Sequence, residues 1–217
     1  MDFDHNKLIA KLAKQVLLPA GLKRKGQSRS YYDDNGWWST KVEFQPSGFS
    51  KGSYLNVGVS WLLYEDDSWG FDIGYRENEF SSAENEAEFT TGIFEMAIHA
   101  KEIAEKNRER FATVSKAHEY YQSIRREGWD FYYGAVIAGL NHEFANAKQN
   151  FNSWLAYPER SERDKEVNAR CRALMHLLDR PKEFIEAVVR IVLNKRALLR
   201  LESKEPSQLG LPSPEEF

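Results

Sequence analysis

Residues 28–46 read SRSYYDDNGWWSTKVEFQP, and their pattern indicates a β-hairpin. Asn35-Gly36 supplies the two residues that a type I′ turn places at positive φ. After this turn, every second residue is suited to a buried sheet face: Trp38, Thr40, Val42 and Phe44. Because side chains alternate between the two faces of a strand, this period of two predicts an antiparallel pair with one face in the core.

The same period continues on both sides of the hairpin. Residues 54–64 and residues 69–75 each alternate apolar with polar side chains and predict two further strands. Before the hairpin, Leu8, Leu12 and Val16 recur every four residues and predict an amphipathic helix. We therefore expect a four-stranded antiparallel meander with one apolar face packed by helices.

From Phe80 almost to the end, the pattern is helical. Ser81 and Glu84 have the spacing of a capping box, which would start a helix there. Residues 131–154 predict a helical hairpin hinged near Asn141, and Pro181 suits the first turn of a last helix. The expected fold class is α+β, with an α+β domain at 1–112, a helical extension at 113–203 and a tail at 204–217.

Composition bounds the class of protein. The 217 residues are 41% hydrophobic and carry a formal net charge of −3. The single cysteine, Cys171, excludes an internal disulfide framework and a multi-cysteine zinc site. No apolar run approaches the roughly 18 residues of a membrane span, and the polar start does not resemble a secretory signal. These features predict a cytoplasmic protein with no membrane partner.

Charge is unevenly distributed along the chain. Residues 28–82 contain four basic and nine acidic residues, together with thirteen of the 29 aromatic residues. Sheets that bind nucleic acid interleave aromatic side chains with Lys and Arg, because phosphate contacts dominate the affinity. Nucleic acid is therefore not expected as a partner. A protein partner with a basic surface suits the acidic, aromatic sheet region.

Motifs for catalysis are mostly missing from the sequence. His118-Glu119 and His142-Glu143 begin like a zinc-protease motif, but neither has a second histidine at the required spacing. There is no Gly-rich phosphate loop and no serine nucleophile elbow, so we expect no cofactor and no metal. Cys171 lies within a predicted helix and is expected to be a small buried residue.

One catalytic alternative remains. Metal-dependent nucleases of the restriction-enzyme type place an Asp before a strand that carries Glu-x-Lys, and the acidic groups hold Mg²⁺. Here Asp33 or Asp34 precedes Glu43 and Gln45, with Asp34 as the named candidate, so the motif has Gln in place of Lys. Gln cannot supply the charge of Lys, and the Asn35-Gly36 turn explains both aspartates without a catalytic role.

Four residues are the candidates for binding. Adjacent strand residues point to opposite faces, so at least one of Trp37 and Trp38 is expected outside the core. Trp37, beside the turn, is the favoured anchor, because Trp dominates many interfaces. The other three candidates are Glu43, Asn56 and Asp72 on the polar sheet face. The enzyme alternative depends on their convergence with Gln45, which is open to them because alternate residues of adjacent strands share a face.

The first third of the chain resembles a family of small bacterial proteins catalogued as a domain of unknown function. Three short segments carry the resemblance: Gly21-Leu22-Lys23-Arg24-Lys25-Gly26, similar to Gly-Phe-Lys-Lys-Lys-Gly with Leu22 in place of Phe; Phe44-Gln45-Pro46-Ser47, similar to Gln-x-Ser; and Asn56-Val57-Gly58-Val59, similar to Asn-x-Gly. The resemblance covers residues 5–75. It implies an α+β fold and no known reaction.

The functional expectation is a non-enzymatic, cytoplasmic protein-binding module, immunity- or antitoxin-like, that uses the acidic aromatic sheet region. The alternative is a metal-dependent hydrolase or nuclease with its site on the polar sheet face. The arrangement of Glu43, Gln45, Asn56 and Asp72 distinguishes the two. Three of these side chains clustered in a cleft with room for a metal favour the enzyme, and the same residues flat in solvent or covered by the C-terminal helices favour a binding or structural role.

Overall fold

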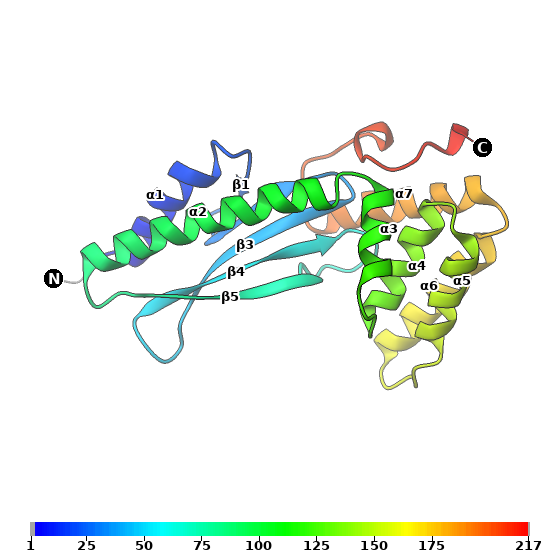
Figure 1. Ribbon diagram of the computed structural model, residues 1–217, viewed down its shortest axis with the longest axis horizontal. Coiled ribbons are helices and arrows are strands. Elements are labelled where there is room, and N and C mark those ends of the chain that lie inside the picture. The colour runs from blue at the N-terminus through cyan, green and yellow to red at the C-terminus, as the bar shows by residue number, and fades with distance from the viewer. Residues whose placement is uncertain (1–2, 217) are drawn as a thin grey trace. The chain divides into compact units, whose positions relative to one another are not determined.

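The Asn35-Gly36 turn joins β2 (Ser30–Asp34) to β3 (Trp38–Pro46), as the sequence predicts. Asn35 N donates to Trp38 O at 3.0 Å, and Gly36 has φ +85°, a conformation that favours glycine. Asn35 does not have the positive φ that a type I′ turn requires, so the position of the turn is as predicted and the turn type is not. The computed structural model, shown in Figure 1, describes residues 3–216, apart from the side chains at 78, 79 and 216.

The described chain divides into two compact units. The first unit runs to Ser60 and resumes from Trp69 to Glu109, and the second comprises Trp61–Ser68 and the chain from Arg110 onward. This division lies close to residue 112, where the sequence pattern changes, and it adds Trp61–Ser68 to the second unit.

The first unit is an α+β structure built on one antiparallel sheet. Besides β2 and β3, its elements are α1 (His5–Leu17), β1 (Lys23–Arg24), β4 (Gly52–Trp61), β5 (Ile73–Ser82) and α2 (Glu86–Arg110). The strands follow the order β1-β2-β3-β4-β5. Tyr31 pairs with Val42 and Tyr54 with Phe80, which fixes the register of two strand pairs. The expected α+β class is confirmed.

The sheet has five strands instead of the expected four. The added strand, β1, comes from the basic segment after α1, where Lys23 pairs with Tyr32. The last strand is β5, at Ile73–Ser82, and residues 69–72 precede it without strand structure. The aromatic residues at 69 and 71 fit a strand period, but Trp69 instead packs on Tyr32, with ring centroids 5.2 Å apart.

Helices α1 and α2 cover one face of this sheet (Figure 1). The core between them contains Ile9 and Leu12 of α1, Tyr31, Val42, Phe44, Leu55 and Val57 of the sheet, and Phe89, Ile93 and Ala97 of α2. A polar contact accompanies the packing: Arg108 of α2 donates two hydrogen bonds, of 2.7 and 2.9 Å, to the buried Asp33.

The predicted capping box at Ser81 and Glu84 is wrong. Ser81 lies in β5, and its side chain donates to Phe89 O at 3.5 Å. The side chain of Asn85 accepts from Ala87 N at 2.9 Å, and it therefore caps α2. A strand that continues for two residues beyond Phe80 moves the start of the helix.

The second unit is helical, so the expected helical C-terminal half is confirmed. Its helices are α3 (Val114–Ser123), α4 (Trp129–Leu140), α5 (Phe144–Leu155), α6 (Glu162–Leu177) and α7 (Pro181–Leu198), followed by the short η1 (Pro206–Gln208) and η2 (Pro214–Glu216). α4 and α5 form the predicted hairpin around Asn141. Pro181 occupies the first turn of α7, where its missing N–H costs no hydrogen bond.

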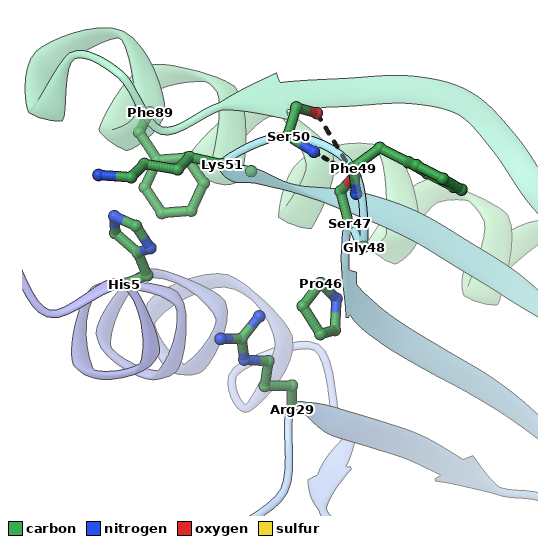
Figure 2. A pocket seen from close by; sticks show the side chains of 10 residues that line it. His5, Arg29, Pro46, Ser47, Gly48, Phe49, Ser50, Lys51 and Phe89 are labelled. Carbon is green, nitrogen blue, oxygen red and sulfur yellow. Dashed lines mark hydrogen bonds between the residues drawn. The ribbon is translucent and has the colours of Figure 1, made fainter.

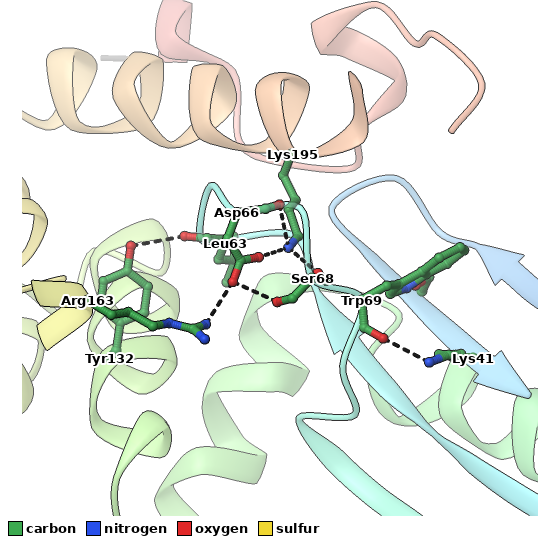
Figure 3. Close-up of polar contacts among 9 residues, drawn as sticks. Lys41, Leu63, Asp66, Ser68, Trp69, Tyr132, Arg163 and Lys195 are labelled. Atoms are coloured by element: carbon green, nitrogen blue, oxygen red, sulfur yellow. Dashed lines mark hydrogen bonds and ion pairs between the residues drawn. The ribbon is translucent and has the colours of Figure 1, made fainter. Parts of the chain in front are cut away.

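Hydrogen bonds explain why Trp61–Ser68 groups with these helices. Trp61 Nε1 donates to Tyr121 Oη at 2.9 Å, and Tyr132 Oη donates to Leu63 O at 3.1 Å. Figure 3 shows the Asp66 carboxylate bound by Arg163 and by the buried Lys195. The segment thus contributes both aromatic and charged groups to the packing of the second unit.

Candidate functional site

Three of the four polar residues on which the enzyme alternative depends do meet on the polar face of the sheet, the outer face opposite α1 and α2. Asn56 of β4 is fully buried, and its Nδ2 donates to Gln45 Oε1 at 2.8 Å and to Glu43 Oε2 at 3.3 Å. Glu43 and Gln45 are alternate residues of β3 and therefore share this face. The pairing of β3 with β4 brings Glu43, Gln45 and Asn56 together, and no loop residue is involved in these contacts.

Arg76 of β5 completes the cluster, and the sequence analysis did not identify it. Its Nη2 donates to Gln45 Oε1 at 2.7 Å and its Nε to Asn56 Oδ1 at 3.4 Å. The pairing of Asn56 with Arg76 across β4 and β5 brings them together. A signal in the sequence would have been an arginine on the polar face of the last strand, but the strand was expected to end at residue 75.

The Arg76 guanidinium therefore lies within hydrogen-bond distance of Gln45 and Asn56, two of the residues on which the hydrolase alternative is based. Across the described residues, no group of three or more His, Cys, Asp or Glu side chains is arranged to hold a metal. The cluster of Glu43, Gln45, Asn56 and Arg76 instead forms hydrogen bonds within itself. Such a satisfied polar network stabilises the pairing of strands β3, β4 and β5.

The two carboxylates of the nuclease alternative are separated. Asp34 pairs with Ser39 and Glu43 with Ser30, so four residues of β3 separate their positions, about 13 Å along the strand. Carboxylates that share one Mg²⁺ each place an oxygen about 2 Å from it. Asp34 Oδ1 accepts from Gly36 N at 3.1 Å, which is the turn interaction expected beside Asn35-Gly36. The structure does not assemble a site from Asp34, Glu43 and Gln45.

Asp72 also lies away from the polar cluster. Its backbone N donates to Val59 O at 2.7 Å, which places it next to Ser60. Ser60 and Asn56 are four residues apart on β4, about 13 Å. Asp72 therefore does not converge with Glu43 and Asn56. It lies one residue before β5, and the β5 residue that pairs with Asn56 is Arg76.

Trp37 is not an exposed anchor. Trp37 and Trp38 each expose only 2% of their surface, so the expectation that one of them leaves the core is wrong. Trp37 lies in the bend before β3, and the alternation of side chains along a strand does not apply to it.

Two of the exposed aromatic residues of the first unit lie on β5, besides Phe49 in the loop before β4 and Phe94 on α2. Tyr75 exposes 51% and Phe80 41% of their surfaces. The Phe80 ring lies 4.8 Å from the Tyr54 ring, and Arg76 stacks over Tyr54 at 4.3 Å. These contacts hold the aromatic rings in place beside the polar cluster, as an aromatic contact surface requires.

Lys41 marks the other end of this face. Its Nζ donates to Trp69 O at 2.8 Å (Figure 3) and lies 4.5 Å from the centre of the Phe71 ring. Burial lowers the pKa of Lys41, and the nearby Glu43 carboxylate partly opposes this shift. The segment of Trp69 and Phe71 thus covers this part of the outer face, and the uncovered part lies toward Tyr75 and Phe80.

A groove of about 440 Å³ lies between β5 and the first half of α2. Phe80, Glu88, Thr91 and Glu95 are among the residues that line it. Gly92 permits the close approach at its floor, because a Cβ there would lie 2.4 Å from Ser81 Oγ. Both elements belong to the first unit, so the unit itself defines the groove.

The groove is set in a strongly acidic stretch. From Glu77 to Ala100 the sequence has six glutamates and neither Lys nor Arg. Four of these glutamates are exposed on or next to α2: Glu84, Glu86, Glu88 and Glu95. Two apolar side chains of the same helix, Phe94 and Ile98, are also exposed. Acidic and apolar surface therefore occur together along β5 and α2.

Cys171 of α6 does not have the properties of a nucleophile. It is fully buried, and this burial raises the pKa of its thiol to about 12. The neighbouring Arg172 opposes the shift only in part. The thiol therefore stays protonated at neutral pH, which fits the small buried residue expected from the sequence.

Comparison with known proteins gave no match: no protein-family model, no curated protein and no solved structure matches this chain. The resemblance of residues 5–75 to a bacterial family therefore stays a prediction. Among the described residues, no helix combines the length and the apolar character needed to cross a membrane.

Proposed function

We propose that the chain is a non-enzymatic protein-binding module, and that its acidic groove between β5 and α2 takes a basic segment of a partner protein. The observation that carries the proposal is the stretch from Glu77 to Ala100, with six glutamates and no Lys or Arg, beside a groove lined by Phe80. We place this binding in the cytoplasm, and an immunity- or antitoxin-like role is the form that we favour.

In this proposal the exposed glutamates and the apolar residues of the groove act at different stages of binding. Exposed glutamates raise the rate of encounter with a basic surface and reject acidic proteins. The affinity then comes from apolar groups that enter the groove, where the half-exposed Phe80 is the principal contact. Glu88 and Glu95 both line the groove, so Lys or Arg side chains of the occupant can pair with them.

A defined pair of peptides tests the proposal. One peptide alternates Lys with Leu or Val, and the other has Glu in place of Lys. We expect the Lys peptide to bind at least about tenfold more tightly at low salt, with affinity falling as salt screens the charges. Fluorescence anisotropy with the full chain measures both affinities.

Two double charge reversals locate the binding. The variant Glu88→Lys/Glu95→Lys changes the groove, and Glu102→Lys/Glu105→Lys makes the same charge change farther along α2. We expect the first variant to lose the preference for the Lys peptide and the second to keep most of it. Equal losses in both variants would show attraction by overall charge alone and would refute a site in the groove.

A further inference from the structure

A second pocket of the first unit has the opposite charge. It has a volume of about 370 Å³ and lies between the first turn of α1 and the loop that joins β3 to β4. Figure 2 shows His5, Arg29 and Lys51 around it. All ten of the residues that line it are described, and none of them is acidic.

These three nitrogen-bearing side chains come from separate parts of the chain. His5 begins α1, Arg29 immediately precedes β2, and Lys51 immediately precedes β4. No motif in the sequence links them, and only the folded sheet with α1 beside it brings them to one pocket. The positive charge of the pocket therefore comes from the fold of the unit and not from a run of basic residues in the sequence.

Neighbouring contacts hold the groups in place. Arg29 Nε donates to Asn6 Oδ1 at 2.5 Å, and in Figure 2 the guanidinium points toward the space between α1 and the loop. The His5 ring packs against Phe89, with centroids 5.3 Å apart. In the loop, Ser47 Oγ accepts from Phe49 N at 3.2 Å and from Ser50 N at 3.3 Å, which fixes its turn.

The electrostatic surroundings favour an anion. Partial burial lowers the pKa of Arg29, while Asp4 opposes this effect. The Asp4 carboxylate itself is held by α1: Oδ1 accepts from Lys7 N at 3.0 Å, and Oδ2 lies 3.5 Å from Lys7 Nζ. A partly desolvated guanidinium interacts more strongly with an anion than one in bulk water does.

We propose that this pocket binds a phosphoryl group, either as inorganic phosphate or as the monoester of a small molecule. Arg29 and Lys51 supply the charge, since guanidinium and ammonium groups both bind phosphate oxygens. His5 and the Ser50 hydroxyl add hydrogen-bond donors. The volume is roughly twelve times the ~30 Å³ that a water molecule occupies in the liquid, so the pocket has room for a small organic group beside the phosphate.

Titration of the isotope-labelled chain tests this site by NMR at constant ionic strength. The probes are inorganic phosphate, glycerol 3-phosphate and, as a monovalent anion, acetate. We expect saturable shifts at the backbone amides of residues 47–52 and 5 with both phosphates, and none with acetate. Tighter binding of glycerol 3-phosphate would identify a monoester as the ligand, and equal or tighter binding of inorganic phosphate would identify the free ion.

Variants complete the test. We expect Arg29→Gln/Lys51→Gln to weaken phosphate binding at least about tenfold. Lys11→Gln/Lys14→Gln removes the same charge from exposed positions of α1 and is expected to leave binding unchanged. The dispersion of the amide spectrum shows that each variant is folded. No saturable shift below about 20 mM phosphate, or equal weakening in both double variants, would overturn the proposal.

Discussion

Arg76 Nη2 lies 2.7 Å from Gln45 Oε1, and the same guanidinium reaches Asn56 Oδ1 at 3.4 Å. These two contacts decide between two roles for the polar face of the sheet, cation binding and stabilisation of the fold. With a carboxylate in place of Arg76, the cluster would attract a cation. With an arginine there, the cluster satisfies its own hydrogen bonds and stabilises the sheet.

Replacing this arginine is therefore expected to affect stability. Arg76→Met removes both hydrogen bonds and leaves the fully buried Asn56 with fewer partners, at a cost of about 1 kcal/mol in the free energy of unfolding. Urea denaturation measures the change. Lys101→Met, at an exposed ion pair of the same unit, is the control and should change stability by less than about 0.5 kcal/mol. Equal effects would contradict a stabilising role for the cluster.

The contact between α2 and β2 gives a larger expected change. Asp33→Asn removes the charge that accepts two hydrogen bonds from Arg108, and Asp33 is buried. We expect a loss of about 2 kcal/mol, since hydrogen bonds to charged groups are stronger than neutral ones. Chemical denaturation checks this value, with the exposed Glu105→Gln as control. A loss no greater than that of the control would show that α2 does not depend on this contact.

Within the second unit, Lys195 gives the corresponding test. Its side chain is buried, and its Nζ contacts the Asp66 carboxylate and the carbonyls of Asp66 and Ser68 (Figure 3). Asp66→Ala would leave a buried ammonium without its carboxylate, so we expect a loss of about 3 kcal/mol. Glu183→Gln disrupts an exposed ion pair of α7 and should have little effect. Thermal and urea unfolding of both variants compare the two.

Cys171 is expected to resist alkylation in the folded protein. With its pKa raised to about 12, the thiol is protonated at pH 8 and is also buried. Iodoacetamide should therefore react at least about a hundredfold more slowly than in denaturant, because the thiolate is the nucleophile. Mass spectrometry follows the adduct. Rapid alkylation without denaturant would contradict the burial of Cys171.

The same shift predicts how stability depends on pH. The unfolded thiol has a pKa of 9.0 and the folded thiol about 12, so the unfolded chain loses its proton first as pH rises. The contribution of Cys171 to the free energy of unfolding is complete below pH 9 and decreases between pH 9 and 12. Cys171→Ala should lessen this decrease, and unfolding measured across that range compares the variant with the native chain.

The sequence predicted the parts of the fold that depend on local pattern. The turn is at Asn35-Gly36, where Gly36 has the positive φ that glycine permits, and the helices α1, α4 and α5 follow from periodic apolar residues and helix-ending signals. Strand β5 was misplaced because Trp69 and Phe71 have the period of a strand but cover the outer face. Alternation alone does not say whether an aromatic residue lies in a strand or over it.

The candidate site was predicted only in part. Glu43, Gln45 and Asn56 share a face by strand alternation, which the sequence shows directly. The place of Arg76 in the cluster and the distance of Asp72 from it both depend on where β5 pairs with β4. This register includes an irregularity between Tyr54 and Asn56, which the sequence does not reveal. The pocket of His5, Arg29 and Lys51 was not predicted, because its members are distant in sequence and meet only through tertiary packing.

The most direct test of the central claim is photocrosslinking from inside the acidic groove. Thr91 lines the groove and is exposed, so a benzoylphenylalanine there would label the occupant; the same residue at the exposed Lys14 is the control. In host lysate we predict one partner crosslinked through a Lys- or Arg-rich segment at position 91 alone, and no crosslink in Glu88→Lys/Glu95→Lys. The same products at both positions, or crosslinking that survives the charge reversal, would contradict the account.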